Sequence, residues 1–202
     1  MSDKIAKRRA DLRTRIIDAA EATILADGIS AVKARDLAKT AGCALGAIYN
    51  VFDDMTHIVL EVNGRTFKRL GVFIADALAA QAPQPPRDAL ITMAKAYLQF
   101  AADNKRAWRT LFDLEMSTEQ DVPEWYMTEL GQLFALIAAP LRALRPELSR
   151  EEIAVLTRAL FSSVHGIVLL GLEQRISGVP LPEIEHMIEV VLISFSEPPS
   201  KI

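Results

Sequence analysis

The sequence predicts an all-α protein, with a small helix-turn-helix domain at residues 1–53 and a second helical lobe at residues 54–202. Three observations lead to this fold class. Apolar residues recur at intervals of three and four along most of the chain. No alternating apolar and polar segment is long enough to predict a strand. Proline- and glycine-containing breaks separate the periodic segments, so each segment is predicted to form its own helix.

The first predicted helix runs from about residue 11 to residue 27, and Gly28 follows at the position of a helix-ending glycine. Residues 1–15 carry six basic and two acidic side chains. We interpret the start of this segment as a basic arm that contacts DNA phosphates. A solvated, disordered tail is the alternative interpretation. The predicted arm consists of Lys4, Lys7, Arg8 and Arg9.

Residues 34–52 contain two short amphipathic helices that meet at Gly42, which can adopt a left-handed turn. The first of these helices is expected to bury Ala34, Leu37, Ala38 and Ala41. The second is expected to bury Leu45, Ile48 and Phe52. Two helices that cross tightly at small residues form a rigid unit that can place one helix in the major groove of DNA.

The segment from Ala26-Asp27-Gly28 through residues 32–38, Ala41-Gly42, residues 46–49 and Phe52 resembles the DNA-binding domain of the TetR family of transcriptional regulators. The resemblance covers about a quarter of the chain. It implies that Tyr49 contacts a phosphate, while Asn50 is the expected polar reader of a base. The predicted DNA-binding residues are Lys33, Arg35, Ala44, Leu45, Gly46, Ala47, Tyr49 and Asn50.

Three positions depart from the pattern of this family. Lys33 and Ala44 stand where these domains usually have a serine or threonine that caps the second and third helices. Met55 replaces a common lysine that adds a phosphate contact in relatives. The basic arm is expected to compensate, or the affinity for DNA is expected to be lower.

After Phe52, a long helix over about residues 54–80 is predicted to join the two lobes and to end at a segment rich in proline. Pro140 is expected to kink or interrupt one of the later helices. Ser149 and Glu152 form a capping-box pattern that fixes the start of another. The later helices are predicted at about residues 87–103, 105–116, 123–144, 149–177 and 181–196.

The last two predicted helices have broad apolar surfaces, which suit a four-helix interface between two copies. TetR-like proteins dimerise through their last long helices, so the resemblance favours a homodimer. The alternative is that these residues face only their own lobe. The predicted interface residues are Leu160, Val164, Val168, Leu172, Ile184, Ile188, Val191, Leu192 and Phe195.

Large side chains in the 87–170 region recur every three or four residues, and such faces can enclose an apolar small molecule. Tyr97, Arg109 and His165 are candidate polar anchors. A stripe of this kind also suits an ordinary core. The predicted pocket residues are Met93, Tyr97, Phe100, Trp108, Arg109, Phe112, Met116, Trp125, Tyr126 and His165.

The composition, with 50% hydrophobic and 24% charged residues, is typical of a soluble globular protein. No apolar run approaches the roughly 20 residues of a membrane span, and a secretory leader is not expected. A single cysteine, Cys43, excludes an internal disulfide framework. We therefore expect a cytoplasmic protein with no membrane partner. Cys43 is interpreted as a small residue of the turn, with a redox switch as the less favoured alternative.

Catalytic and metal sites find little support in the sequence. Glu183 and His186 have the spacing of one half of a di-iron site, but the second half is missing, so we interpret His186 as a surface histidine. Ser162, Ser163 and His165 lie near one another without the motif of a serine nucleophile. No cofactor is predicted.

The favoured hypothesis is a ligand-responsive transcriptional regulator without enzymatic activity. By family default it is a repressor that binds a palindromic operator as a homodimer and is released by a small, mostly apolar effector. The alternative is a helical enzyme or ligand carrier with a helix-turn-helix-like corner that does not bind DNA.

Overall fold

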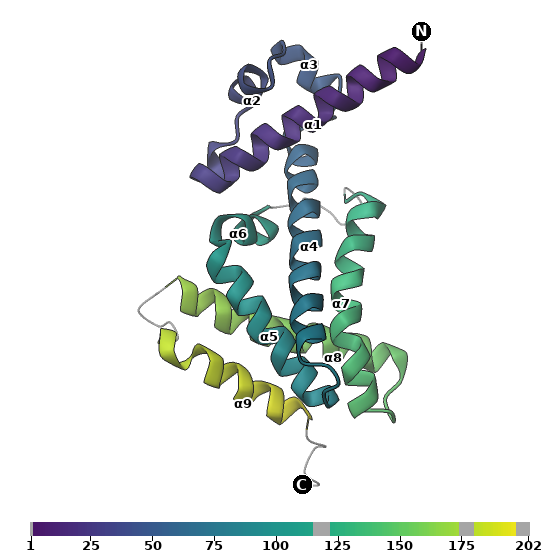
Figure 1. The fold of residues 1–202 in the computed structure, drawn as a ribbon, viewed down its shortest axis with the longest axis vertical. Helices are drawn as coiled ribbons and strands as arrows, with labels where there is room; N and C mark the ends of the chain where they lie inside the picture. The colour runs from purple at the N-terminus through teal and green to yellow at the C-terminus, as the bar shows by residue number, and fades with distance from the viewer. Residues whose placement is uncertain (1, 115–121, 174–179, 197–202) are drawn as a thin grey trace. The chain divides into compact units, whose positions relative to one another are not determined.

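The computed structural model describes residues 2–114, 122–173 and 180–196. These residues form nine α-helices and two short 3-10 helices, and no strand occurs among them (Figure 1). The predicted all-α class is therefore confirmed. The chain divides into two compact units, which are described separately below. The first unit contains residues 1–68 and 104–127, and the second contains residues 69–103 and 128–202.

The first unit begins with α1 (Ser2–Asp27), followed by η1 (Ile29–Ala31), α2 (Ala34–Ala41) and α3 (Leu45–Tyr49). Figure 1 shows α2 and α3 packed on the same side of α1. The helix α1 starts nine residues before the predicted start at residue 11. The prediction missed these turns because the side chains from Lys4 to Ala10 are exposed and mostly polar, so they carry no apolar periodicity.

The core of the helix-turn-helix contains the residues that the apolar spacing predicts. Ile16 and Ile24 of α1 are fully buried together with Ile48 of α3, and Phe52 closes the cluster. Leu45 was expected to be buried, but 45% of its surface is exposed. It is the first residue of the five-residue α3, and the core closes around Ile48 one turn later rather than around the start of the helix.

The first half of α4 (Met55–Ala80) belongs to the first unit, because ion pairs connect it to α1. Arg13 pairs with Glu61. The guanidinium of Arg65 lies 2.7 Å from Asp18 and 2.6 Å from Glu21. The packing thus extends the first unit to residue 68, whereas the functional boundary at residue 53 remains a prediction.

The helix α6 (Lys105–Asp113) also belongs to the first unit and contacts α1. Trp108 on α6 is fully buried. Arg106 on the same helix donates hydrogen bonds to the carbonyls of Leu25, at 2.9 Å, and Ala26. These two carbonyls lie in the last turn of α1 and lack partners within the helix, so Arg106 caps α1.

The second unit contains α5 (Pro86–Asp103), most of α7 (Glu124–Leu144), α8 (Arg150–Leu172), η3 (Leu181–Glu183) and α9 (Ile184–Ser196). The predicted capping box is present, because the Glu152 amide donates to Ser149 Oγ at 3.2 Å and the Ser149 amide donates to Glu152 Oε2 at 2.8 Å. The expected interruption at Pro140 does not occur, since α7 continues through it to Leu144. A proline inside a helix removes one backbone donor and crowds the preceding turn, which can bend a helix without ending it.

The helix α8 is long and apolar enough to cross a membrane by length and composition. A single helix of this kind is weak evidence for a membrane span, because core helices of soluble proteins pass the same test. One side of α8 is buried in the second unit, at Ile153, Leu160 and Val168, and the helix contacts α5 and α9. Its apolar composition is consistent with this packing.

Candidate functional sites

The predicted DNA-binding residues lie on one exposed part of the helix-turn-helix. Gly42 adopts the left-handed conformation, with φ 66° and ψ 46°, and the Cys43 amide donates to the Ala38 carbonyl at 2.9 Å. This turn separates α2 from α3, as the sequence predicts. Exposed residues among the predicted set are Lys33, Arg35, Ala44, Leu45, Gly46, Tyr49 and Asn50, and Ala47 is partly buried.

The caps of these helices also follow the sequence analysis. Neither Lys33 before α2 nor Ala44 before α3 makes a side-chain capping hydrogen bond. The sequence analysis missed the cap of α4, where the His57 amide donates to Asp54 Oδ1 at 2.9 Å. Partial burial raises the pKa of Asp54, but hydrogen bonds from His57 and from the Thr56 backbone together bring it below its ordinary value.

The basic residues near the N-terminus differ in their environments. Lys4, Lys7, Arg8 and Arg9 are exposed on the first turns of α1. In contrast, Arg15 donates to the Ala41 carbonyl at the end of α2. The charges assigned to the arm therefore lie on a helix, and Arg15 supports the turn of the helix-turn-helix.

The predicted pocket residues fall into both units. In the second unit, Tyr97 Oη lies 2.8 Å from His165 Nδ1, and Phe161 stacks on the His165 imidazole at 5.6 Å between ring centroids. Tyr97 is buried and His165 is partly buried. Two of the three predicted polar anchors are thus brought together, from α5 and α8. Met93 and Phe100 are buried on α5 as well.

The other predicted pocket residues belong to the first unit. Trp108 and Phe112 contact each other edge to face, and so do Trp125 and Tyr126 at the start of α7. Arg109, the third polar candidate, forms an ion pair with Asp113 at 2.9 Å. Met116 lies outside the described residues.

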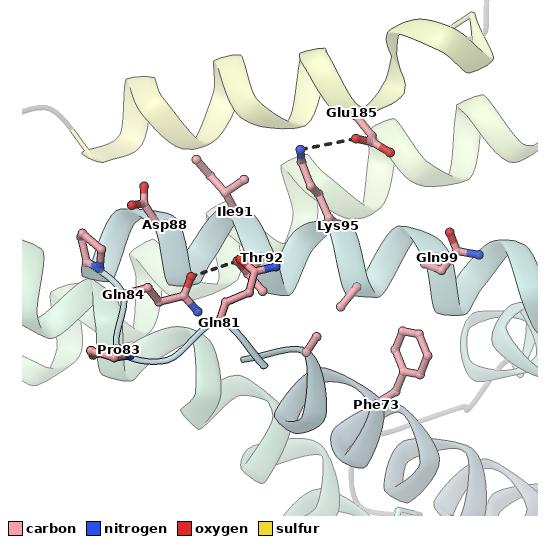
Figure 2. A pocket seen from close by; sticks show the side chains of 13 residues that line it. Phe73, Gln81, Pro83, Gln84, Asp88, Ile91, Thr92, Lys95, Gln99 and Glu185 are labelled. Atoms are coloured by element: carbon pink, nitrogen blue, oxygen red, sulfur yellow. Dashed lines mark hydrogen bonds and ion pairs between the residues drawn. The ribbon is translucent and has the colours of Figure 1, made fainter. Parts of the chain in front are cut away.

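An open cavity of about 750 Å³ in the second unit was not predicted (Figure 2). It lies among the end of α4, the segment that follows α4, α5 and α9. Thr92 Oγ1 lies 3.1 Å from the side-chain oxygens of both Gln81 and Gln84. Lys95 lies 3.4 Å from Glu185, which also lines the cavity. Its lining mixes polar and apolar residues from several segments of the chain, so a search for apolar stripes had no signal for it.

The predicted dimer residues differ in how deeply they are buried within the single chain. Six of them are buried inside this single chain and therefore form its own core: Leu160, Val164, Val168, Ile184, Ile188 and Leu192. Leu172, Val191 and Phe195 are partly buried. Sequence composition does not distinguish core from interface. The apolar residues that α8 and α9 expose are different ones: Val155, Leu170, Met187, Val190 and Ile193.

No group of three or more histidine, cysteine, aspartate or glutamate side chains among the described residues is arranged to hold a metal ion. Cys43 has a free, partly buried thiol.

Comparison with known proteins assigns the family. Residues 16–62 match the model of bacterial regulatory proteins of the tetR family, and residues 90–194 match the model of the tetracyclin repressor-like C-terminal domain. The chain therefore belongs to the TetR family, whose members are DNA-binding regulators that respond to ligands. These regulators are generally transcription factors without enzymatic activity.

Solved structures agree on the fold. A TetR transcriptional regulator from Rhodococcus sp. RHA1 has a TM-score of 0.63 at 18% identity, covering 96% of this chain and 100% of its own. PfmR from Thermus thermophilus has a TM-score of 0.60 at 20% identity, with coverages of 93% and 100%. RolR, solved with the ligand resorcinol, has a TM-score of 0.68 at 16% identity, covering 98% of each chain. No curated protein matches the sequence.

Proposed function

We propose that the protein is a cytoplasmic repressor that binds a palindromic operator as a homodimer and is released by a small, mostly apolar effector. The exposed face of α3 is the observation that carries this proposal. It presents Leu45, Tyr49 and Asn50 to solvent on a rigid support, while Ile48 and Phe52 hold the helix from behind. A helix exposed in this way can enter a major groove.

The roles of the exposed residues follow from their chemistry. Arg35 and Lys33 are cations beside the start of α2 and suit phosphate oxygens. Asn50 can pair with adenine through two hydrogen bonds, whereas the small apolar side chains on α3 suit thymine methyl groups. Because base contacts are few, the shape of the DNA is expected to contribute to specificity.

The exposed apolar face of α8 and α9 supports the homodimer. Val155 and Leu170 on α8, with Val190 and Ile193 on α9, leave apolar surface in solvent. Between Val155 and Leu170, the same side of α8 carries the small residues Ala159, Ser162 and Gly166, which permit close helix contact. A dimer would place two α3 helices on half-sites about 34 Å apart.

The polar pair of Tyr97 and His165 supports an effector site in the region of residues 87–170. A phenol bonded to an imidazole inside an aromatic cluster can exchange its partner for a ligand group. Resorcinol is the ligand of the structural relative RolR. A small ring-containing effector fits the aromatic character of the cluster formed by Tyr97, Phe134, Phe161 and His165.

Selection of binding sites from random duplex DNA tests the proposal. The selected duplex is then titrated with the wild type, Arg35→Ala and Tyr49→Phe over a range of salt concentrations. We expect both variants to bind more weakly, and affinity to fall linearly on logarithmic axes as salt rises. Arg87→Ala, in the second unit, is the charge-matched control and should bind like the wild type. If folded protein fails to bind DNA at low salt, the alternative of a helical enzyme or ligand carrier replaces this proposal.

A further inference from the structure

Asn63 is a fully buried amide in the first unit with one of its two polar atoms unpaired. Its side-chain nitrogen donates to the Thr110 carbonyl at 3.1 Å. Its side-chain oxygen, Oδ1, is buried and accepts no hydrogen bond. Reversing the amide would point an oxygen at the Thr110 carbonyl oxygen, so the orientation is fixed by that contact. A buried acceptor of this kind is rare in folded proteins and calls for a donor.

The surroundings of Asn63 are aromatic. One helical turn further along α4, the Phe67 ring lies 5.1 Å from the Tyr126 ring. The Trp125 indole packs on the adjacent Gly64, so closely that a Cβ atom there would lie 2.7 Å from the ring. Burial raises the pKa of Tyr126, and a hydrogen bond between its side chain and the Asn63 amide opposes part of that shift. The Tyr126 phenol is therefore neutral at physiological pH.

We propose that Asn63 marks a second ligand site, within the first unit: Oδ1 accepts a hydrogen bond from the O–H or N–H group of a small neutral aromatic molecule, of the class of phenols and aromatic amines. This site goes beyond the proposed function, because Asn63 lies in the first unit whereas Tyr97 and His165 lie in the second. A carboxylate ligand is disfavoured, since its oxygens would face the Oδ1 acceptor. A hydrocarbon is disfavoured because it leaves Oδ1 unpaired.

The side-chain nitrogen of Asn63 connects the site to α1 through α6. This nitrogen donates to the Thr110 carbonyl on α6. The Thr110 hydroxyl in turn donates to the Arg106 carbonyl at 2.9 Å. Arg106 in turn caps the last turn of α1 through Leu25 and Ala26. A ligand that shifts the Asn63 amide therefore shifts α6, and α6 changes the support of the helix on which the helix-turn-helix packs.

Binding of the probes phenol, aniline and anisole to the full chain is measured by tryptophan emission and by thermal unfolding. Both tryptophans of the chain, Trp108 and Trp125, lie in the first unit. Anisole keeps the ring and the oxygen of phenol, but a methyl group replaces the O–H donor. We expect phenol to bind about tenfold more tightly than anisole, the effect of one hydrogen bond. Equal affinities, or no saturable response to phenol or aniline, would overturn the proposal.

The variant Asn63→Leu removes the amide while keeping the same branched arrangement of side-chain heavy atoms. Its affinity for phenol should fall about tenfold, to the level of anisole. The control Thr157→Val removes another buried polar group, the hydroxyl that donates to the Ile153 carbonyl in the second unit. It should leave phenol binding unchanged. If folded Asn63→Leu binds phenol as well as the wild type does, Asn63 is not the acceptor. If that variant does not fold, the comparison of phenol with anisole in the wild type tests the same hydrogen bond.

Transmission to α1 is tested by hydrogen exchange of the last turn of α1 with and without phenol. In the wild type, phenol should change exchange at the amides near Leu25. Arg106→Gln should bind phenol normally and lose this response, whereas Arg87→Gln should keep it. A full response in Arg106→Gln would refute the route through α6. These measurements use no DNA, so a failure of the proposed DNA binding is detected separately.

Discussion

Asn50 is the polar side chain on the exposed surface of α3 that is best suited to discriminate between bases. Its neighbours Ala44, Gly46 and Ala47 offer no side-chain hydrogen bonds. Replacing Asn50 with alanine should therefore cost about 1–3 kcal/mol at one base position and relax specificity there. Competition binding against every single-base variant of the selected duplex measures this. A loss of the same size on all sequences would assign Asn50 to phosphate contact instead.

Asp54 stabilises the start of α4 by accepting a hydrogen bond from the His57 amide. Asp54→Ala should lower the free energy of unfolding by about 1 kcal/mol, the usual effect of losing a cap. Asp54→Asn, which keeps an acceptor oxygen, is the control and should lose less. Urea denaturation of the three proteins gives the difference, and equal stabilities would show that this cap contributes nothing.

The lowered pKa of Asp54 gives the same interaction a pH dependence. An aspartate whose pKa is lower in the folded state binds protons more readily when unfolded. Its contribution is therefore complete above the ordinary value of 3.8 and disappears as pH falls through the lower folded-state value. The stability difference between wild type and Asp54→Ala should shrink in acid below that range and stay constant near neutral pH.

At the scale of helices, the sequence predicted those helix ends that depend on residues close together in the chain. Gly42 and the pair of Ser149 and Glu152 set helix ends through their own backbone contacts, so their effects were visible in the sequence. The early start of α1 was not, because exposed polar turns leave no periodic pattern. Asn63 was also missed, since its partner Thr110 lies 47 residues away and only the fold brings them together.

The distinction between core and interface on α8 and α9 likewise required the fold. Val164 and Val190 are equally apolar in the sequence, but Val164 is 7% exposed and Val190 is 49% exposed. The buried members of the predicted interface pack in the core of their own chain, while the interface and the dimer stay predictions. A charge at Val164 would disrupt the core rather than test an interface.

Val190→Glu places a charge on the exposed apolar face of α9 without entering the core. We expect it to convert a dimer to monomers and to weaken operator binding, because a desolvated charge in an interface lacks a partner. Val72→Glu, at an equally apolar position of α4 with 61% exposure, is the control and should stay dimeric. Analytical ultracentrifugation measures both, and an intact dimer in Val190→Glu would exclude this face.

The close packing of Trp125 on Gly64 gives a second test at the scale of helices. Gly64→Ala adds a Cβ atom 2.7 Å from the indole, so the ring must move. Gly131→Ala on α7 adds a Cβ with nothing within 4 Å. The control should gain up to about 1 kcal/mol of helix stability. Gly64→Ala should gain less and shift the tryptophan emission, and identical behaviour of the two variants would contradict the packing.

At the scale of the whole molecule, the effector and the operator are expected to favour different arrangements of one protein. The long helix α4 has its first half in the first unit and its second half in the second, so it provides a covalent route between them. Operator DNA should then weaken effector binding by the factor by which effector weakens DNA binding, typically about 5–150-fold. Titrations of effector into free and DNA-bound protein measure this. Equal affinities in both would favour direct competition at the DNA surface.

The helical start of α1 has a consequence for the thermodynamics of DNA recognition. Lys4, Lys7 and Arg8 are like charges three and four residues apart, and they lie near the positive end of the helix dipole. Both effects oppose the first turns of α1 in the free protein, most strongly at low ionic strength. Phosphates that neutralise these cations would remove the penalty, so part of the binding free energy is expected to go into extending this helix. Circular dichroism in the far ultraviolet should therefore show helix content rising with salt in the free protein and rising further when DNA is added.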